Sequence, residues 1–250
     1  MKRLIVNADD YGRTAGVNAG TLEAHLAGIV TSATVMILEG AAREGVRLAR
    51  ERAPQLALGL HCVLTGGGAP ASPPGKLSTL APGGKFVRNA EALPDSIDPG
   101  EVRRELEAQI ALFESAAGRL PTHLDSHHHC ALHPAVAPVF AALAAELHLP
   151  ARAANDRARE TLRALGVRVP DRFLDGFYAE GATVENLRSL ISGLEDGTAE
   201  LMCHPGRPDA ELLAGSTYAL ERAREVQILC DPAIRLLLDE RGIELVSFEA

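Results

Sequence analysis

The stretch LIVNADD, residues 4–10, carries the pattern on which the fold depends. A short apolar run, typical of a buried strand in a parallel sheet, is followed at once by two acidic residues, Asp9 and Asp10. Because parallel α/β folds place functional residues at the carboxyl ends of strands, this pattern predicts a strand that ends in a site. Three more apolar runs end in the same way, at His61, in the cluster 123–134 and at His204.

The same alternation of apolar runs and helical patterns extends along the chain. It favours one α/β domain over residues 1–250, folded as a (β/α) barrel or a distorted variant with a mostly parallel sheet. An open doubly wound sheet would place its polar residues in the same way. We expect strands at 3–7, 31–38, 56–61, 122–126, 151–154, near Phe173, at 199–203 and at 244–248, and helices at 101–117, at 135–147 and between Asp231 and Gly242.

One segment, residues 63–100, breaks this alternation with runs rich in glycine and proline, directly after His61. Long irregular loops in a compact domain are usually functional covers or disordered insertions. Because the segment follows a proposed ligand, we expect it to act as a lid over the substrate. We expect residues 205–218, after His204, to form a facing wall.

Composition excludes several classes of function. The chain has 250 residues, a formal net charge of -8 and 46% hydrophobic residues, so it lacks the basic surface that nucleic acid requires. No apolar run approaches the length of a membrane span, and we expect a cytoplasmic protein. The four cysteines have no CxxC spacing, which favours buried packing over disulfides. No sequence feature marks an interface, so a homodimer and a monomer both remain open.

The cluster HLDSHHHCALHP, residues 123–134, is typical of a metal site. It holds five of the nine histidines and one aspartate, and these side chains donate lone pairs to divalent ions near neutral pH. The two-residue period of a strand places His127 at the rim as a ligand and Asp125 one layer deeper, where it can orient a ligand. We expect His128 to point away, toward the surrounding helices.

The other strand ends supply acid–base chemistry. On a regular strand Asp9 and Asp10 point to opposite faces, so one carboxylate can bind a metal while the other takes a proton from the attacking water. His61 ends its strand as a third candidate ligand. His204 is a fourth ligand or a general acid, and the acid role is preferred because hydrolytic metals keep an open position.

Four blocks in matching order, NADDYG, GLHCVLT, THLDSHHH and MCHPG, resemble the YdjC-like family of carbohydrate deacetylases. The resemblance implies a TIM-like or distorted barrel enzyme, a hydrolase that removes an N-acetyl group from an amino sugar or short N-acetylated oligosaccharide. It implies that Asp10, His61 and His127 bind the metal, that Asp9 is the base, and that His204 is the family's late histidine.

The resemblance also implies Mg²⁺, whereas two imidazoles and one carboxylate suit Zn²⁺, Mn²⁺ or Co²⁺ equally well. Because the chain has no tryptophan, sugar stacking would depend on Tyr11, Phe86, Phe177 or Tyr178. We expect Tyr11, Tyr178 and Arg152 to bind substrate. Arg152, just past a predicted strand, could also pair with a catalytic carboxylate.

Two other functions remain open at this point. A barrel metallohydrolase could act on another amide, an ester or a phosphoester, although the motifs have few basic neighbours for phosphate: Arg13, Lys76, Arg152 and Arg207. A metal- or ligand-binding domain without turnover is the third reading. The presence of Asp9 as a base favours catalysis over that reading.

Overall fold

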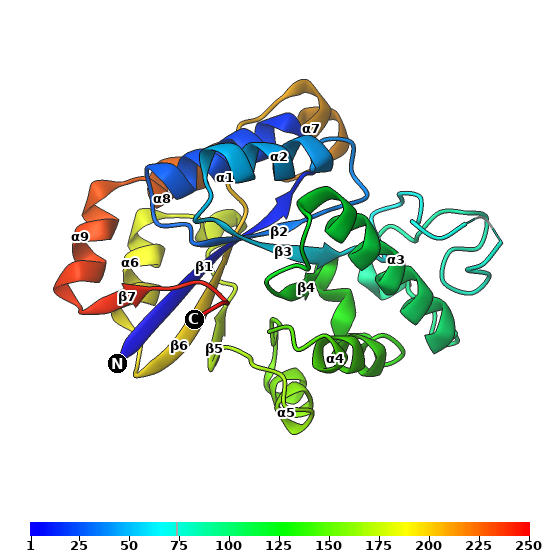
Figure 1. Cartoon of the computed structure of the whole chain (residues 1–250). Coiled ribbons are helices and arrows are strands. Elements are labelled where there is room, and N and C mark those ends of the chain that lie inside the picture. The colour runs from blue at the N-terminus through cyan, green and yellow to red at the C-terminus, as the bar shows by residue number, and fades with distance from the viewer. Residues whose placement is uncertain (74) are drawn as a thin grey trace. The chain divides into compact units, whose positions relative to one another are not determined.

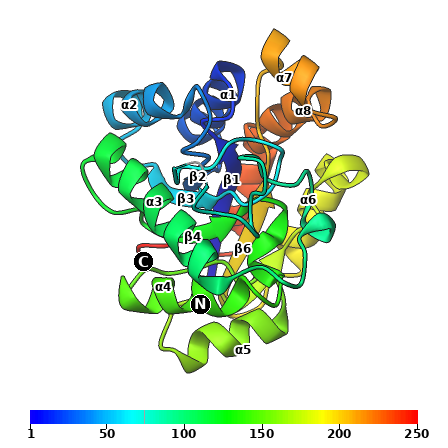
Figure 2. The same cartoon turned by 90° about the vertical axis from the view of Figure 1, so that its right-hand side faces the viewer.

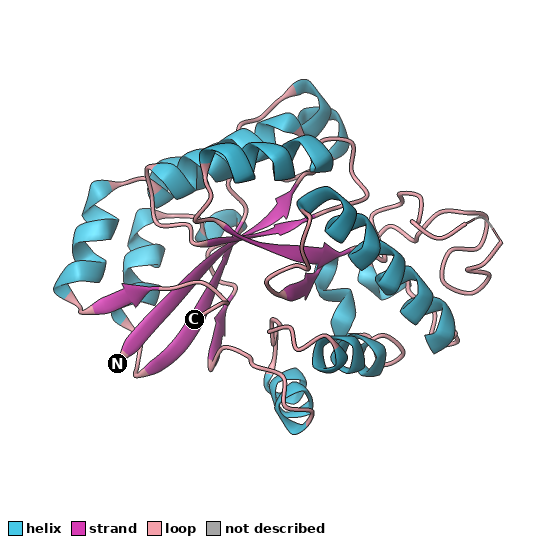
Figure 3. Ribbon diagram, in the orientation of Figure 1, coloured by secondary structure: helices cyan, strands magenta, loops and turns pink. Residues whose placement is uncertain are grey.

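The computed structural model describes residues 1–73 and 75–250. In this part of the chain seven strands form one sheet in the order β4-β3-β2-β1-β6-β5, with β7 beside β1 (Figures 1 and 3). Strand β1 is parallel to β2, β6 and β7, and the pairs β3–β4 and β5–β6 are also parallel. The strands are β1 Lys2–Tyr11, β2 Ser32–Val35, β3 Ala57–Cys62, β4 Leu124–Ser126, β5 Arg172–Leu174, β6 Gly197–Cys203 and β7 Ile243–Leu245.

Helices alternate with the strands. They are α1 Ala15–Leu26, α2 Ala42–Arg52, α3 Pro99–Ala117, α4 Ala137–Glu146, α5 Asp156–Ala164, α6 Val184–Ser192, α7 Ala210–Gly215, α8 Leu220–Leu229 and α9 Pro232–Glu240. Short 3₁₀ helices lie at η1 Ala90–Ala92, η2 His127–Leu132 and η3 Ala179–Gly181. Among the described residues, no helix has both the length and the apolar composition to cross a membrane.

The chain divides into two compact units. The first unit comprises Met1–Val35, Glu39–Leu58 and Pro170–Ala250, and the second comprises Met36–Leu38 and Gly59–Val169. In the first unit, α1 packs against α2 and α8, and α6 packs against α9 (Figure 1). In the second unit, α4 contacts both α3 and α5 (Figure 2).

Strand β1 is central to the first unit. It pairs with β6 from Lys2 to Ala8 along one edge. Its other edge pairs first with β7 and then, from Asn7 onward, with β2. Leu4 and Val6 are fully buried, as the apolar run predicted. The register to β2 shifts between Ala8 and Tyr11, so a bulge lies at the acidic pair.

Helix ends follow the local capping chemistry. Asp98 caps α3 by accepting a hydrogen bond from the Gly100 N–H, Pro99 occupies the first turn, and Gly118 ends the helix with φ +72°. The predicted helix 101–117 is therefore confirmed, with two more residues at its start. The last predicted helix is also confirmed: Asp231 caps α9, and Gly242 follows its end with φ +61°.

The predicted α/β class with a mostly parallel sheet is confirmed, and it is consistent with a distorted TIM-like barrel. One predicted strand is wrong. Residues 151–154 contribute only an isolated bridge between Ala151 and Leu124, because the next residue, Asn155, already caps α5. The predicted strand 122–126 is shortened to Leu124–Ser126.

The segment 63–100 is tied to one face of α3. Glu105 accepts hydrogen bonds from the Ala71 and Ser72 N–H groups, both at 2.9 Å. Burial alone would raise the pKa of Glu101, but hydrogen bonds from Leu80, Thr79 and Ser78 outweigh it and lower that pKa to about 2. The role as a lid stays a prediction, and Pro74 within this segment lies outside the described residues.

Candidate active site

Asp9 lies near the end of β1 and is held by its neighbours. It is 2% exposed, and its Oδ1 accepts a hydrogen bond from the Asn7 amide at 2.9 Å. The same amide nitrogen lies 3.2 Å from Thr34 Oγ1 on β2. Asn7 and Asp9 are two residues apart on a strand and therefore share a face. The carboxylate orientation is thus set by an amide that is itself anchored to the next strand.

Asp10 adopts a conformation that a regular strand does not provide. Its φ is +65°, in the left-handed region that few residues other than glycine enter. Its Oδ2 forms a buried ion pair with Arg222 and lies 3.4 Å from Arg13 Nη1. Two cations therefore favour the charged form of this carboxylate, the form that binds a metal.

His61, Asp125 and Arg152 form a buried chain of polar contacts. His61 Nδ1 lies 2.7 Å from Asp125 Oδ1, and Arg152 Nη1 lies 3.0 Å from Asp125 Oδ2. A carboxylate only accepts hydrogen bonds, so Nδ1 carries the proton and the Nε2 lone pair faces outward from Asp125. This arrangement is typical of metal-binding histidines, whose second nitrogen donates to a carboxylate.

His127 is the first residue after β4 and is 7% exposed. Its ring lies edge-on to His61, with 5.4 Å between the centroids. The expectation that His128 points away is wrong, because it stacks on His127 at 3.8 Å and is exposed. The strand period ends at Ser126, and His128 and His129 take φ values of 53° and 51° in η2.

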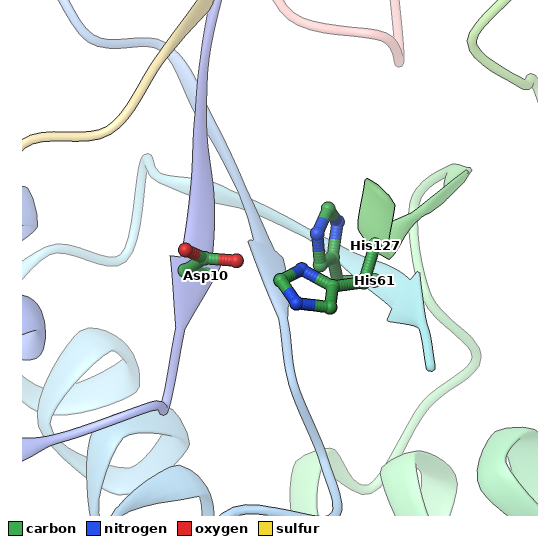
Figure 4. A group of neighbouring side chains, drawn as sticks. All are labelled: Asp10, His61 and His127. Carbon is green, nitrogen blue, oxygen red and sulfur yellow. The ribbon is translucent and has the colours of Figure 1, made fainter. Parts of the chain in front are cut away.

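The described residues contain a group with the chemistry of a metal site. Asp10, His61 and His127 each offer one ligand atom, and these atoms lie within 4.8 Å of one another (Figure 4). Donors that share one ion lie at most about 4.2 Å apart, twice a bond length of about 2.1 Å, so small side-chain rotations suffice. All three residues are buried. The donor set, one carboxylate and two imidazoles, therefore fits a divalent ion.

A second group joins Asp9, His61 and Asp125 with the same 4.8 Å limit. Both Asp9 and Asp10 thus have an oxygen near a His61 nitrogen, although a regular strand would send neighbours to opposite faces. The bulge and the positive φ of Asp10 account for the difference. The sequence argument from strand alternation is therefore wrong at this pair.

His204 follows β6 and is half-buried. Its backbone N–H donates to Glu225 Oε2 at 2.5 Å, and its ring lies near Tyr178 and Tyr218. Burial raises the pKa of Glu225 to about 7; the charge of Asp9 adds to this rise, whereas hydrogen bonds from Tyr218 and His204 and the charge of Arg222 oppose it. A buried carboxyl group with a raised pKa thus contacts the backbone of His204.

The predicted substrate residues fall in different places. Tyr178 is 43% exposed beside His204, where a ligand can reach it. The expectation of a rim hydroxyl on Tyr11 is wrong, because the side chain is fully buried and its hydroxyl donates to the Gly45 carbonyl at 2.7 Å. Arg152 is 5% exposed and holds Asp125, so its guanidinium acts on a carboxylate rather than on substrate.

Sequence reasoning missed Arg222 and Glu225, and it included Tyr218 only as the end of the predicted wall 205–218. A signal for the first two existed, because Arg222 and Glu225 share the buried face of α8 with Val226 and Leu229. Charged residues on an apolar helix face are rarely buried without a partner. Asn7 was also missed, although it lies two residues before Asp9 on the same strand.

Comparisons with known proteins show full-length relatives. The sequence model of the family described as YdjC-like protein matches residues 3–240. A carbohydrate deacetylase of Geobacillus stearothermophilus is 42% identical over 98% of this chain and 96% of its own length. A chitooligosaccharide deacetylase of Serratia marcescens is 38% identical over 99% of this chain and 98% of its own.

Solved structures extend the comparison. A crystal structure from Enterococcus faecalis V583 has a TM-score of 0.93 and 34% identity, covering 99% of this chain and 98% of that one. A family 4 acetyl xylan esterase from Clostridium thermocellum, in complex with a cobalt ion, has a TM-score of 0.51 and 15% identity, covering 98% of this chain and 88% of that one. The second likeness concerns the fold alone. On the full-length matches, the chain belongs to the YdjC-like family.

Proposed function

We propose that this protein is a metal-dependent carbohydrate deacetylase that removes an N-acetyl group from an amino sugar or a short N-acetylated oligosaccharide. The observation that carries the proposal is the buried group of Asp10, His61 and His127, with Asp9 beside it. Relatives named carbohydrate deacetylase and chitooligosaccharide deacetylase match nearly the whole chain and support the substrate class.

The ion that this group would hold supplies Lewis-acid polarisation of the amide carbonyl. The chain's own residues divide the remaining work. Asp9, oriented by Asn7, takes the proton from the attacking water. His204 gives a proton to the departing amine. The reaction needs no covalent enzyme intermediate, because water supplies the oxygen of the released acetate.

The identity of the ion is the finer part of the proposal. One carboxylate and two imidazoles suit Zn²⁺, Mn²⁺ or Co²⁺, and Mg²⁺ follows from the family resemblance. We propose a divalent ion held by Asp10, His61 and His127, with Asp125 fixing the tautomer of His61. Reloading the chelated protein with each ion in turn ranks the four candidates by recovered activity.

The decisive experiment follows free acetate after incubation of the metal-loaded protein with N-acetylated mono- and oligosaccharides. Asp9→Asn and chelation should each reduce the rate by about a hundredfold or more, since each removes a component that the reaction requires. Asp156→Asn, at an exposed surface aspartate, is the matched control and should keep the wild-type rate.

The outcomes separate the alternatives. Acetate release that survives both chelation and Asp9→Asn contradicts the mechanism. Release from O-acetylated sugars alone identifies an esterase. No release from any acetylated sugar, together with tight metal binding, favours a domain that binds ligand without turnover.

A further inference from the structure

Three aromatic rings, including that of His204, form a contiguous cluster. The rings of Tyr178 and Tyr218 stack at 4.4 Å with 24° between their planes, and the His204 ring lies 5.2 Å from Tyr178 and 5.9 Å from Tyr218. We call these three residues the aromatic wall. Tyr178 is 43% exposed, whereas Tyr218 is 8% exposed. Only one ring of the stacked pair is therefore presented to a ligand.

A single buried carboxylate, Glu225, contacts two of the three residues of the wall. The Tyr218 hydroxyl donates to Glu225 Oε1 at 2.5 Å and accepts from the Ala179 N–H at 3.1 Å. Glu225 Oε2 accepts from the His204 N–H at 2.5 Å. Ala179, the neighbour of Tyr178, has a strained φ of +52°. The hydrogen bond from its N–H to the Tyr218 hydroxyl helps to hold this conformation.

The wall is also joined to a proposed metal ligand. Arg222 Nε donates to the Tyr218 carbonyl at 2.9 Å, and its guanidinium lies 5.7 Å from the centre of the Tyr218 ring. The same guanidinium forms the ion pair with Asp10. Arg222 and Glu225 lie three residues apart on the buried face of α8, and Tyr218 lies just before that helix.

Packing alone does not explain this arrangement. Glu225 is fully buried, and removing a carboxylate from water costs several kcal/mol unless hydrogen bonds offset the loss. An apolar residue would fill the same space without that cost. Buried polar networks of this kind fix side chains in one geometry, which is the requirement of a site that must position a substrate.

We propose that Tyr218 and Glu225 are positioning residues for the sugar: they hold Tyr178 and His204 in one preassembled wall, on which the apolar C–H face of a pyranose ring stacks. This inference rests on the proposed deacetylase function. Stacking on Tyr178 presents the acetamido group to Asp9 and His204 in a single orientation. Neither Tyr218 nor Glu225 contacts the reacting atoms.

The kinetic test uses Tyr218→Phe, which keeps the ring and removes the hydroxyl. KM for the N-acetylated sugar should rise about tenfold, while kcat changes less than about threefold, because uniform sugar binding is weakened. Glu225→Gln, which keeps an oxygen acceptor for Tyr218, should give a smaller rise and serves as the second variant if Tyr218→Phe does not fold. Thr31→Val is the matched control, since it removes a hydroxyl that accepts a hydrogen bond from the Val6 N–H of β1 and does not belong to the wall.

A second readout does not depend on turnover or metal. The chain has no tryptophan and three tyrosines, and Tyr11, the last residue of β1, is fully buried with its hydroxyl on the Gly45 carbonyl of α2. Tyrosine emission of the metal-free protein therefore reports on the wall, and titration with the deacetylated amino sugar should change it. Tyr178→Phe should remove most of this change, and Tyr218→Phe should shift the midpoint to about tenfold higher sugar concentration.

The results distinguish this inference from the proposed function. Sugar-dependent emission without acetate release would contradict the proposed deacetylase function and support sugar binding at the aromatic wall. If acetate is released but both Tyr218→Phe and Glu225→Gln keep KM and the emission midpoint within about twofold of wild type, Tyr218 and Glu225 are not positioning residues. A loss of thermal stability alone, equal to that of Thr31→Val, would assign Tyr218 to packing only.

Discussion

At the scale of single residues, Asp125 sets the chemistry of His61, although it is not one of the three proposed ligands of the ion. Its two oxygens contact His61 and Arg152 in a site that is almost wholly closed to solvent. Asp125→Asn replaces one acceptor by a donor and removes the charge, so the tautomer of His61 is no longer fixed.

We therefore expect Asp125→Asn to lower the affinity for the divalent ion by about 10–100-fold. Competition with a metal-chelating dye measures this change directly. Asp156→Asn, at a surface aspartate paired with Arg159, should leave the affinity unchanged. An unaltered affinity in Asp125→Asn would show that His61 is oriented by other contacts.

Glu225 gives a prediction about pH. Its folded-state pKa of about 7 is above the ordinary value of 4.5, so the folded protein binds a proton more tightly than the unfolded chain. This contribution to stability is fully present below pH 4.5 and is lost as the pH rises through 7. It amounts to about 3 kcal/mol at most.

The difference in the free energy of unfolding between wild type and Glu225→Gln, measured by denaturant titration from pH 4.5 to 8, should fall across this window. Taking a difference removes the titration of groups that both proteins share. A difference that is independent of pH would place the pKa of Glu225 near its unfolded value.

Residue types and spacing were enough to identify most of the candidate site. Asp10, His61 and His127, all at or just past strand ends, form the group that the structure contains. The orientation of Asp9 and Asp10 could not be predicted. At a bulge, one unusual backbone dihedral, the φ of Asp10, changes the direction in which the side chains point. Tyr11 was misplaced because a hydroxyl in a motif does not show whether its ring faces the core.

At the scale of elements, Gly59 on β3 makes room for a histidine ring. A Cβ at Gly59 would lie 2.5 Å from His123 Cε1, closer than real contacts allow. His123 precedes β4 and is fully buried, so its ring cannot move into solvent to make room for a Cβ at Gly59. The absent side chain thus sets the distance between β3 and the chain leading into β4.

Gly59→Ala should therefore lower the free energy of unfolding by about 1–3 kcal/mol, the usual effect of overpacking. Thermal or denaturant melts measure the loss. Gly40→Ala is the matched control, because nothing lies within 4 Å of its added Cβ. Equal stability of the two variants would mean that the His123 ring shifts without cost.

Element types were more predictable than element ends. Every predicted strand except 151–154 coincides with a strand of the sheet, because short apolar runs form buried strands. Helix α3 was predictable from Gly118 and from its apolar face. The strand prediction for residues 151–154 failed for two reasons. Arg152 pairs with Asp125, which is a tertiary contact, and Asn155 caps helix α5. Local hydrophobicity shows neither effect.

At the scale of the molecule, a ligand that binds only the folded chain stabilises it by mass action. A divalent ion at one hundred times its dissociation constant should add about 3 kcal/mol to the free energy of unfolding. The melting temperature with and without chelator measures this shift. His127→Ala should abolish the metal-dependent part of the shift, whatever its effect on the chelated protein, and a retained shift would place the ion elsewhere.

The pairing of β1 has a consequence for how the chain is made. Its partners β6 and β7 lie at residues Gly197–Cys203 and Ile243–Leu245, so β1 is synthesised long before either of them. During that interval its apolar edge is open, a state that invites aggregation or chaperone capture. The stretch Gly59–Val169, by contrast, is continuous and can condense while the remainder is still being translated.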